Sequence, residues 1–173
     1  GGSASYAGIA ASYFARPGMV SIAGTDLPAK YLDLFRSKQI DLAGVTITGA
    51  NFRWAGQYSF DLSHATTLTT KLNGLSTFKP KLPAHYQTAK VLLLANIEPA
   101  LQILVARQLR TALTILDTMN FWIEREGPQL LQAIKLADVL VLNDAEARQL
   151  GGELNLVKVA KQLLKLGPTY VII

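Results

Sequence analysis

Polar side chains follow three apolar runs in the second half of the chain, and their types suit the binding of hydroxyls, phosphates or Mg²⁺. Asn96 follows the run Val91–Ala95, Asp117 follows Ala112–Leu116, and Asn143 follows Asp138–Leu142. In an open α/β sheet, ligands bind just beyond the carboxyl ends of the strands. If these runs are neighbouring strands, the sequence predicts a ligand-binding rim at one edge of a sheet.

Two of these side chains have a structural explanation as well. Asn and Asp are good N-cap residues, so Asp117 or Asn143 also suits the start of the next helix. Glu146 lies three residues after Asn143, which is the spacing of a capping box. From the residues alone, ligand binding and helix capping both stay open at these positions.

The elements that would position the rim alternate from Val91 onward. Predicted strands are Val91–Ala95, Thr111–Leu116, Asp138–Leu142 and Tyr170–Ile173, and predicted helices are Pro99–Arg110, Gly127–Leu136, Ala145–Leu150 and Leu154–Leu166. Uninterrupted apolar strands that alternate with helices indicate a parallel sheet covered on both faces. The predicted fold class is therefore α/β.

The first half of the chain is predicted to be less regular. A helix is expected over Ala7–Phe14, and residues 19–90 are expected to form short strands and loops. The expected strands are Val20–Ala23, Val45–Thr48 and Arg53–Phe60. Ser63–Asn73 is a polar stretch rich in Thr, and the two prolines in Phe78–Pro83 break any regular element.

Composition excludes several classes of protein. Half of the 173 residues are hydrophobic and 17% are charged, which argues against a disordered chain. No apolar run approaches the roughly 20 residues that span a bilayer, and no secretory signal is visible. The absence of cysteine excludes disulfides and thiolate metal sites. These features predict a soluble cytoplasmic protein without a membrane partner.

The net charge of +5 raises the question of a nucleic-acid partner. The basic residues are dispersed, however, and the tightest group is Lys158, Lys161 and Lys165. Their helical spacing, opposite Val157, Ala160, Leu163 and Leu164, predicts a solvated helix face. No nucleic-acid partner is therefore predicted.

Familiar catalytic motifs are absent. The sequence has no GxxxxGK[ST], no GxGxxG after a strand and no GxSxG. His64 and His85 lie far apart in the sequence without a zinc-ligand partner at helical spacing, so both are predicted to be surface residues. Residue chemistry alone leads to a ligand-binding α/β domain.

Six segments taken together resemble the ribokinase-like (PfkB) family of sugar and nucleoside kinases, in order and spacing. The most specific is Val141–Ala147, which is similar to the family's N-x-x-E motif, and Leu116–Asn120 resembles its D-x-N strand end. The others are Gly1–Gly8, which resembles a glycine-pair turn into a helix, Ser21–Asp26, Gln39–Val45 and Gly167–Ile173.

The resemblance implies a ribokinase-like parallel sheet flanked by helices, with a small β lid. Residues 1–173 would form part of a PfkB-type kinase domain, with the lid at about 44–62 and the α/β core at 91–173. The aromatic residues Trp54 and Tyr58 fall in the lid, where stacking on a ligand ring and ordinary packing are both open. In that family the lid often serves as a dimer surface, so the resemblance is compatible with a homodimer.

The activity that the resemblance implies is ATP-dependent phosphorylation of a hydroxyl of a sugar or nucleoside, with ATP and Mg²⁺ as cofactors. Gly1, Gly2 and Asp117 would contact the substrate. Asn143 and Glu146 would lie on the Mg²⁺–phosphate side, with Glu146 reaching the metal through a water molecule. Tyr6 stands where many members carry an Asn that contacts the sugar, so the substrate stays open.

A member of the family would have one more strand before Gly1, and its catalytic base would lie in a G-x-G-D motif after Ile173. We therefore expect the chain to be incomplete, to contain no catalytic residue and to be inactive alone. Two alternatives stay open: a non-catalytic module that binds sugars or nucleosides, and an unrelated α/β nucleotide-dependent transferase.

Overall fold

The computed structural model describes residues 2–60 and 65–173, and these residues form two compact units. One unit comprises Leu82–Ile173 with the residues before Gly8, and the other comprises Gly8–Lys81. Among the described residues, no helix combines the length and the apolar character needed to cross a membrane.

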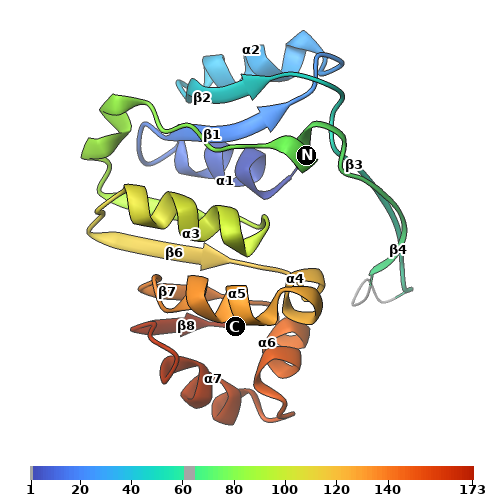
Figure 1. The fold of residues 1–173 in the computed structure, drawn as a ribbon, viewed down its shortest axis with the longest axis vertical. Helices are drawn as coiled ribbons and strands as arrows, with labels where there is room; N and C mark the ends of the chain where they lie inside the picture. Colours follow the sequence, from blue (N-terminus) through green and yellow to red (C-terminus); the bar gives the residue numbers. More distant parts are fainter. Residues whose placement is uncertain (1, 61–64) are drawn as a thin grey trace. The chain divides into compact units, whose positions relative to one another are not determined.

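The unit that contains Leu82–Ile173 is built on a four-stranded parallel sheet with the order β5-β6-β7-β8. The strands are β5 (Val91–Leu94), β6 (Leu113–Asp117), β7 (Val139–Val141) and β8 (Tyr170–Ile172). The helices are α3 (Pro99–Gln108), α4 (Asn120–Arg125), α5 (Gly127–Ile134), α6 (Asp144–Gly151) and α7 (Leu156–Leu164), and a 3₁₀ helix, η2, covers Ala84–Thr88. In Figure 1, α3 and α5 lie in front of this sheet, and the arrow of β6 points toward α4.

The core of this unit lies on the two central strands. Leu116 of β6 and Leu140 of β7 are paired in register and have no exposed surface. Leu130 and Ile134 of α5 and Leu163 of α7 belong to the same buried cluster. Helices therefore cover the face of the sheet that carries Leu116 and Leu140, and the parallel sheet with its helices confirms the α/β class. The expectation that both faces are covered is not met in this unit, because large apolar side chains on the opposite face are 42–61% exposed: Val91, Leu93, Tyr170 and Ile172.

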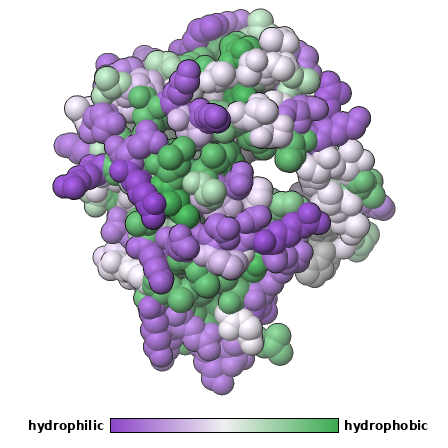
Figure 2. Space-filling view, viewed as in Figure 1, coloured by the Kyte–Doolittle hydropathy of each residue, from purple (hydrophilic) through white to green (hydrophobic). Residues whose placement is uncertain are grey.

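Helix α7 presents the three lysines to solvent, as its spacing predicted. Lys158, Lys161 and Lys165 are all exposed, and Figure 2 shows hydrophilic residues over the lower end of the molecule, where α7 lies. The buried side differs from the prediction, because Val159 and Leu163 are buried whereas Val157 is 64% exposed. The buried face of α7 therefore runs along Val159 and Leu163, and Val157 lies outside it.

Helix α4 was not predicted. Its N-cap residue, Met119, makes no capping hydrogen bond, and it contains aromatic and β-branched residues that are poor helix formers. A contact from outside the helix holds it: Nε1 of Trp122 donates to Oδ1 of Asn96 at 2.9 Å. Tertiary contact has overridden local propensity here.

The unit Gly8–Lys81 contains two small sheets. Strands β1 (Gly18–Ala23) and β2 (Asp41–Ile47) are parallel, and β3 (Arg53–Tyr58) pairs antiparallel with β4 (Ala65–Lys71). The helices are α1 (Ser3–Ala11), which begins in the other unit, α2 (Ala29–Ser37) and the 3₁₀ helix η1 (Asn73–Thr77). Figure 1 shows β3 and β4 as a long two-stranded ribbon.

Two elements of this unit correct the expectation of short strands and loops. Helix α2 occupies a stretch that was expected to be irregular, and it connects the parallel strands β1 and β2. The Thr-rich stretch contains strand β4, in which Oγ1 of Thr67 accepts a hydrogen bond from Nε1 of Trp54 at 3.0 Å. Threonine is β-branched and suits a strand. Because it is polar, a run of threonines lacks the apolar residues by which a strand is recognised in a sequence. Residues 61–64, which include His64, lie outside the described residues.

Gly167 provides a test of the turn that leads into β8. Its φ is +141°, and a Cβ atom there would lie 3.1 Å from Cα of Lys135. We expect Gly167→Ala to lower the free energy of unfolding by about 1–3 kcal/mol, because the backbone would be strained and crowded. Urea unfolding measures the change. Gly127→Ala is the control, since nothing lies within 4 Å of its Cβ position, and equal losses in both variants would contradict the prediction.

Candidate ligand-binding rim

The carboxyl ends of β5, β6 and β7 meet at one edge of the sheet. The parallel register pairs Leu94 with Leu116 and Asp117 with Val141, so the residues that end or follow these strands are neighbours. Asn96, Asp117 and Asn143 therefore belong to one rim, as their spacing predicted, and Asp117 is the last residue of β6 rather than the first after it.

Asp117 is not a helix cap. The next helix, α4, begins at Asn120 with Met119 as its N-cap, so the capping explanation fails at this position. The carboxyl group is half-buried, and burial raises the pKa of Asp117 above its ordinary value. The backbone N–H groups of Asn96 and Thr118 lower this pKa by a smaller amount. Such a group is able to hydrogen-bond a ligand hydroxyl.

Asn143 and Glu146 form a capping box at the start of α6. Oδ1 of Asn143 accepts from the backbone N–H of Glu146 at 2.8 Å, and Oε2 of Glu146 accepts from the backbone N–H of Asn143 at 3.0 Å. The capping explanation is thus confirmed for this pair. The box uses Oε2 of Glu146, and Oε1 lies outside the box.

Glu146 and Asp117 interact electrostatically across the rim. Burial is the largest cause that raises the pKa of Glu146, and the negative charge of Asp117 raises it further, while the hydrogen bonds with Asn143 lower it. Two carboxylates that repel each other in a half-buried site are stabilised by a cation or by hydroxyl donors. The rim therefore has the charge of a site for a metal ion or a polyhydroxy ligand.

A buried side chain beneath the rim was missed by the sequence analysis. Gln102 of α3 is 1% exposed, and its Nε2 lies 3.2, 3.0 and 2.9 Å from the carbonyl oxygens of Leu94, Ala95 and Asp117. The signal was present, because Gln102 falls three residues after Pro99 and one before Ile103, all of which face the core. A polar residue on the apolar stripe of a predicted helix indicates a specific partner.

The predicted glycine pair is described only in part. Gly1 lies outside the described residues. Gly2 has a φ of +90°, which favours glycine, and its carbonyl oxygen accepts hydrogen bonds from the backbone N–H groups of Ser5 and Tyr6 at 3.1 and 3.3 Å. Nothing lies within 4 Å of its Cβ position, and Tyr6 is exposed. A ligand contact at Gly2 stays a prediction.

The segment Ser21–Asp26 forms a polar turn in the other unit. The backbone N–H of Gly24 donates to Oδ1 of Asn51 at 2.8 Å, and the backbone N–H of Asn51 donates to Oδ1 of Asp26 at 2.7 Å. Nη2 of Arg53 lies 3.0 Å from Oδ2 of Asp26. These bonds lower the pKa of Asp26, the one from Asn51 most of all, and they fasten the start of β3 to the end of β1.

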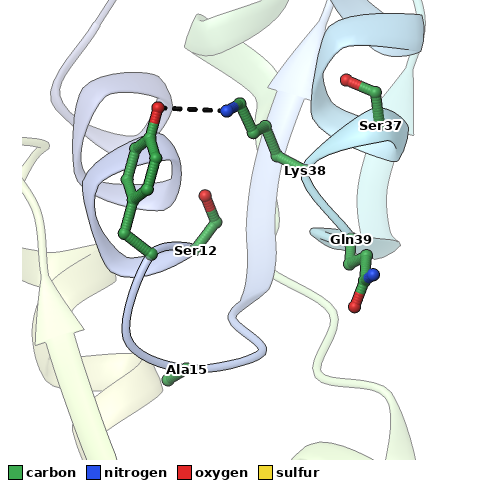
Figure 3. Close-up of a pocket in the computed structure, with 6 residues that line it drawn as sticks. Ser12, Ala15, Ser37, Lys38 and Gln39 are labelled. Atoms are coloured by element: carbon green, nitrogen blue, oxygen red, sulfur yellow. Dashed lines mark hydrogen bonds between the residues drawn. The ribbon is translucent and has the colours of Figure 1, made fainter.

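An open hollow of about 230 Å³ also lies in that unit, and Figure 3 shows the residues that line it. Nζ of Lys38 donates to the hydroxyl of Tyr13 at 3.0 Å and lies 4.5 Å from the centre of its ring. The hollow contains no carboxylate and none of the predicted site residues. The polar residues that the sequence predicted to bind a ligand lie at the rim and not in this hollow.

The carboxylate oxygens of Asp117 and Glu146 suit a Mg²⁺ ion that keeps most of its water ligands. Within residues 2–60 and 65–173, no group of three or more His, Cys, Asp or Glu side chains could hold a metal ion. Mg²⁺ in nucleotide sites is typically held by one or two carboxylates together with waters and phosphate oxygens. Asp117 and Glu146 suit that arrangement and do not suit an all-protein metal cage.

Comparison with known proteins shows the fold. No protein-family model matches the chain, and no curated protein matches it. Among solved structures, it is similar to a PfkB protein from Polaromonas sp. JS666, with 19% identity, a TM-score of 0.72, and coverage of 96% of this chain and 64% of that one. Fructokinase from Halothermothrix orenii shows 15% identity and a TM-score of 0.74 over 100% of this chain and 68% of that one.

Adenosine kinase from Anopheles gambiae, solved in complex with P1,P4-di(adenosine-5) tetraphosphate, has 18% identity and a TM-score of 0.72 over 97% of this chain and 56% of that one. The chain therefore has the ribokinase-like fold, and the resemblance found in its motifs is confirmed at the level of fold. It spans between about half and two thirds of the length of the structures that it matches.

The capping box gives a prediction about stability. We expect Asn143→Ala to lower the free energy of unfolding by about 0.5–2 kcal/mol, because the N–H of Glu146 loses its acceptor. Asn143→Asp is the control and should lose much less, since Asp is an equally good N-cap. Urea unfolding of the three proteins measures the difference, and an Ala variant as stable as the wild type would contradict it.

The raised pKa of Asp117 predicts how stability depends on pH. Above the ordinary value of 3.8, the unfolded chain loses this proton before the folded chain does. The contribution of Asp117 is therefore fully present below that pH and is lost as the pH rises through the higher folded pKa. Asp117→Asn keeps the size of the side chain and one oxygen acceptor but does not titrate.

The measurement is urea unfolding of the wild type and Asp117→Asn from pH 3 to pH 7. We expect the stability of the variant relative to the wild type to increase across this range, because only the wild type pays the cost of a half-buried charge. Parallel stability curves for the two proteins would show that the pKa is not raised.

Proposed function

We propose that the protein to which this chain belongs transfers a phosphoryl group from ATP to a hydroxyl of a sugar or nucleoside. The observation that supports this most directly is the position of two partly buried carboxylates, Asp117 and Glu146, at the carboxyl rim of a ribokinase-like sheet. The similar structures include a fructokinase and an adenosine kinase, and phosphorylation of a sugar or nucleoside is the reaction class that their names share.

The proposed roles follow from the position of each group. Asp117 accepts hydrogen bonds from substrate hydroxyls, and the backbone of Gly1 and Gly2 contacts the same substrate. Asn143 and Glu146 lie on the phosphate side, where the capping box fixes Glu146 with Oε1 toward the ligand. Phosphoryl transfer depends chiefly on positioning and on the neutralisation of charge, and these residues supply the positioning.

Mg²⁺ is part of the proposal because of the charges at the rim. Asp117 and Glu146 would repel a triphosphate unless a cation stood between them. Bound Mg²⁺ would screen this repulsion and neutralise charge that develops on the transferred phosphoryl group. Glu146 would reach the ion through a water molecule, as the resemblance to ribokinase-like kinases implies.

No residue among Gly1–Ile173 is assigned as the catalytic base. The resemblance locates that aspartate in a G-x-G-D segment after Ile173, so this chain alone is proposed to bind ligands without turnover. Binding without turnover by the natural protein would instead favour a non-catalytic binding module.

The hairpin β3–β4 supports a proposal about assembly. Trp54 and Tyr58 of β3 and Leu68 of β4 are all exposed, at 39%, 56% and 63%. An isolated two-stranded hairpin is only marginally stable in water. A second copy that covers these side chains would form a homodimer through the lid.

We also propose that the protein acts in the cytoplasm, where ATP is abundant.

Glu146→Gln separates the catalytic role of Glu146 from its structural role. Gln at this position also completes a capping box, so we expect stability to change by less than about 0.5 kcal/mol. Since the charge on the metal side is lost, we expect kcat/KM for phosphoryl transfer to fall by about 10–100-fold. The assay measures ATP- and Mg²⁺-dependent phosphorylation of a panel of sugars and nucleosides by the natural protein.

Asp33→Asn is the matched control, because Asp33 is an exposed carboxylate on α2 that pairs with Arg36 on the same helix. It should keep wild-type kinetics. The proposal is wrong if the natural protein phosphorylates no sugar or nucleoside, and the role of Glu146 is wrong if the two variants behave alike.

A further inference from the structure

Trp122 holds the side chain of Asn96 in one orientation. Nε1 of Trp122, on α4, donates to Oδ1 of Asn96 at 2.9 Å, and both side chains are half-buried. An indole N–H only donates, whereas an Asn amide has an oxygen that accepts and a nitrogen that donates. The atom that faces Trp122 is therefore the oxygen, and the amide nitrogen Nδ2 is turned away from it.

The amide nitrogen of Asn96 is left as a donor for a ligand. Within residues 2–60 and 65–173, the side chain of Asn96 makes no hydrogen bond besides the one from Trp122. In the same residues, the buried side-chain atoms without a partner are Oε1 of Gln102 and Oγ1 of Thr118. Nδ2 of Asn96 is therefore open to solvent, just beyond the carboxyl end of β5.

Helix α4 supports the indole by contacts of its own. The ring of Phe121 packs edge-on against that of Trp122, with the ring centres 4.8 Å apart. Nε2 of Gln149, on α6, donates to Oε1 of Glu124 at 2.9 Å. Figure 1 shows α4 beyond the tip of β6 and beside α6. The indole is thus held by groups other than Asn96, and it is able to fix the orientation of the amide.

Asn96 lies on the substrate side of the rim. The strand order is β5-β6-β7, so Asp117, at the end of β6, stands between Asn96, after β5, and Asn143, after β7. The proposed phosphate side is that of Asn143 and Glu146. Asn96 is therefore a neighbour of Asp117 on the side away from the phosphates.

Asn96 and Asp117 offer opposite hydrogen-bonding groups. A carboxylate accepts, and the nitrogen of an oriented amide donates. A hydroxyl group has one proton and two lone pairs, so a hydroxyl that donates to Asp117 still accepts from an N–H group. Two neighbouring acceptors would compete for the single proton. A donor beside an acceptor is therefore the pair that fits one hydroxyl.

We propose that Asn96 is a substrate-binding residue: its Nδ2 donates to the oxygen of the hydroxyl whose proton Asp117 accepts. Trp122 is the positioning residue that keeps Nδ2 toward the substrate. This inference rests on the proposed function, in which Asp117 contacts the sugar or nucleoside. It names the group that is recognised as a hydroxyl that donates and accepts at once.

Asn96→Asp separates substrate binding from the support of α4. The carboxylate has the same size and still accepts from Trp122, but at neutral pH it has no proton to donate. NMR should therefore show the indole N–H of Trp122 still protected from exchange with solvent. A ligand hydroxyl, in contrast, would face two acceptors, and we expect its Kd to rise by about tenfold.

The natural protein is titrated with D-fructose, D-ribose, adenosine and any further sugar or nucleoside that it phosphorylates. ATP and Mg²⁺ are left out, so the charge added by Asn96→Asp does not act through the nucleotide or the metal. A Kd in Asn96→Asp equal to that of the wild type would overturn the role of Asn96 in substrate binding.

Trp122→Phe tests the orientation of the amide. Phe keeps an aromatic ring but has no N–H, so the amide of Asn96 is free to turn over. With Nδ2 toward the substrate for about half of the time, the apparent Kd should rise by about twofold. An unchanged Kd would overturn the positioning role. The wild type covers a Phe variant that does not fold, because an indole N–H of Trp122 that exchanges like an exposed one would overturn the same role.

Glu124→Ala is the matched control, because Glu124 lies on the same helix and bonds to Gln149 of α6. Its Kd should stay near that of the wild type, and an equal rise in Glu124→Ala and Asn96→Asp would overturn the inference. If the natural protein binds and phosphorylates no sugar or nucleoside, the proposed function fails, and the substrate role of Asn96 fails with it. The exchange of the Trp122 N–H still decides whether Trp122 orients the amide.

Discussion

The burial of one face of β6 and β7 beneath helices is the constraint on which the rest of the structure depends. Leu116 and Leu140 face each other in register with no exposed surface. A face packed against helices has no room for unpaired polar side chains. The ligand-binding chemistry therefore lies at the strand ends, and the parallel direction of the strands collects Asn96, Asp117 and Asn143 at one rim.

Structural and functional explanations of the rim are not exclusive. At Glu146, one carboxylate oxygen closes the capping box with Asn143, and the other is left for a ligand. At Asp117 the capping explanation fails, and burial raises the pKa of the carboxyl group. The repulsion between the two carboxylates gives this edge of the sheet its preference for a cation or for hydroxyl groups.

The sequence predicted the elements whose pattern is local. Strands β5 to β8 and helices α3, α5, α6 and α7 were located by apolar runs, by Pro99 and by the Gly167–Pro168 stop. Helix α2, helix α4 and strand β4 were missed. Strand β4 is rich in Thr, and its pairing with β3 rather than its polarity makes it a strand. Helix α4 depends on the bond between Trp122 and Asn96, which lie 26 residues apart.

The sequence by itself determined the α/β class, the collinear motifs of a ribokinase-like fold and the capping box, because each depends on residues within a few positions of one another. Only the tertiary structure decided what surrounds Asp117. The N–H of Asn96 and the charge of Glu146 come from other parts of the chain, and the amide of Gln102 lies 2.9 Å from the backbone carbonyl oxygen of Asp117. Burial then decides the direction in which the pKa of Asp117 moves. A linear pattern shows neither, since burial and contact distance are set only when the helices close over the sheet.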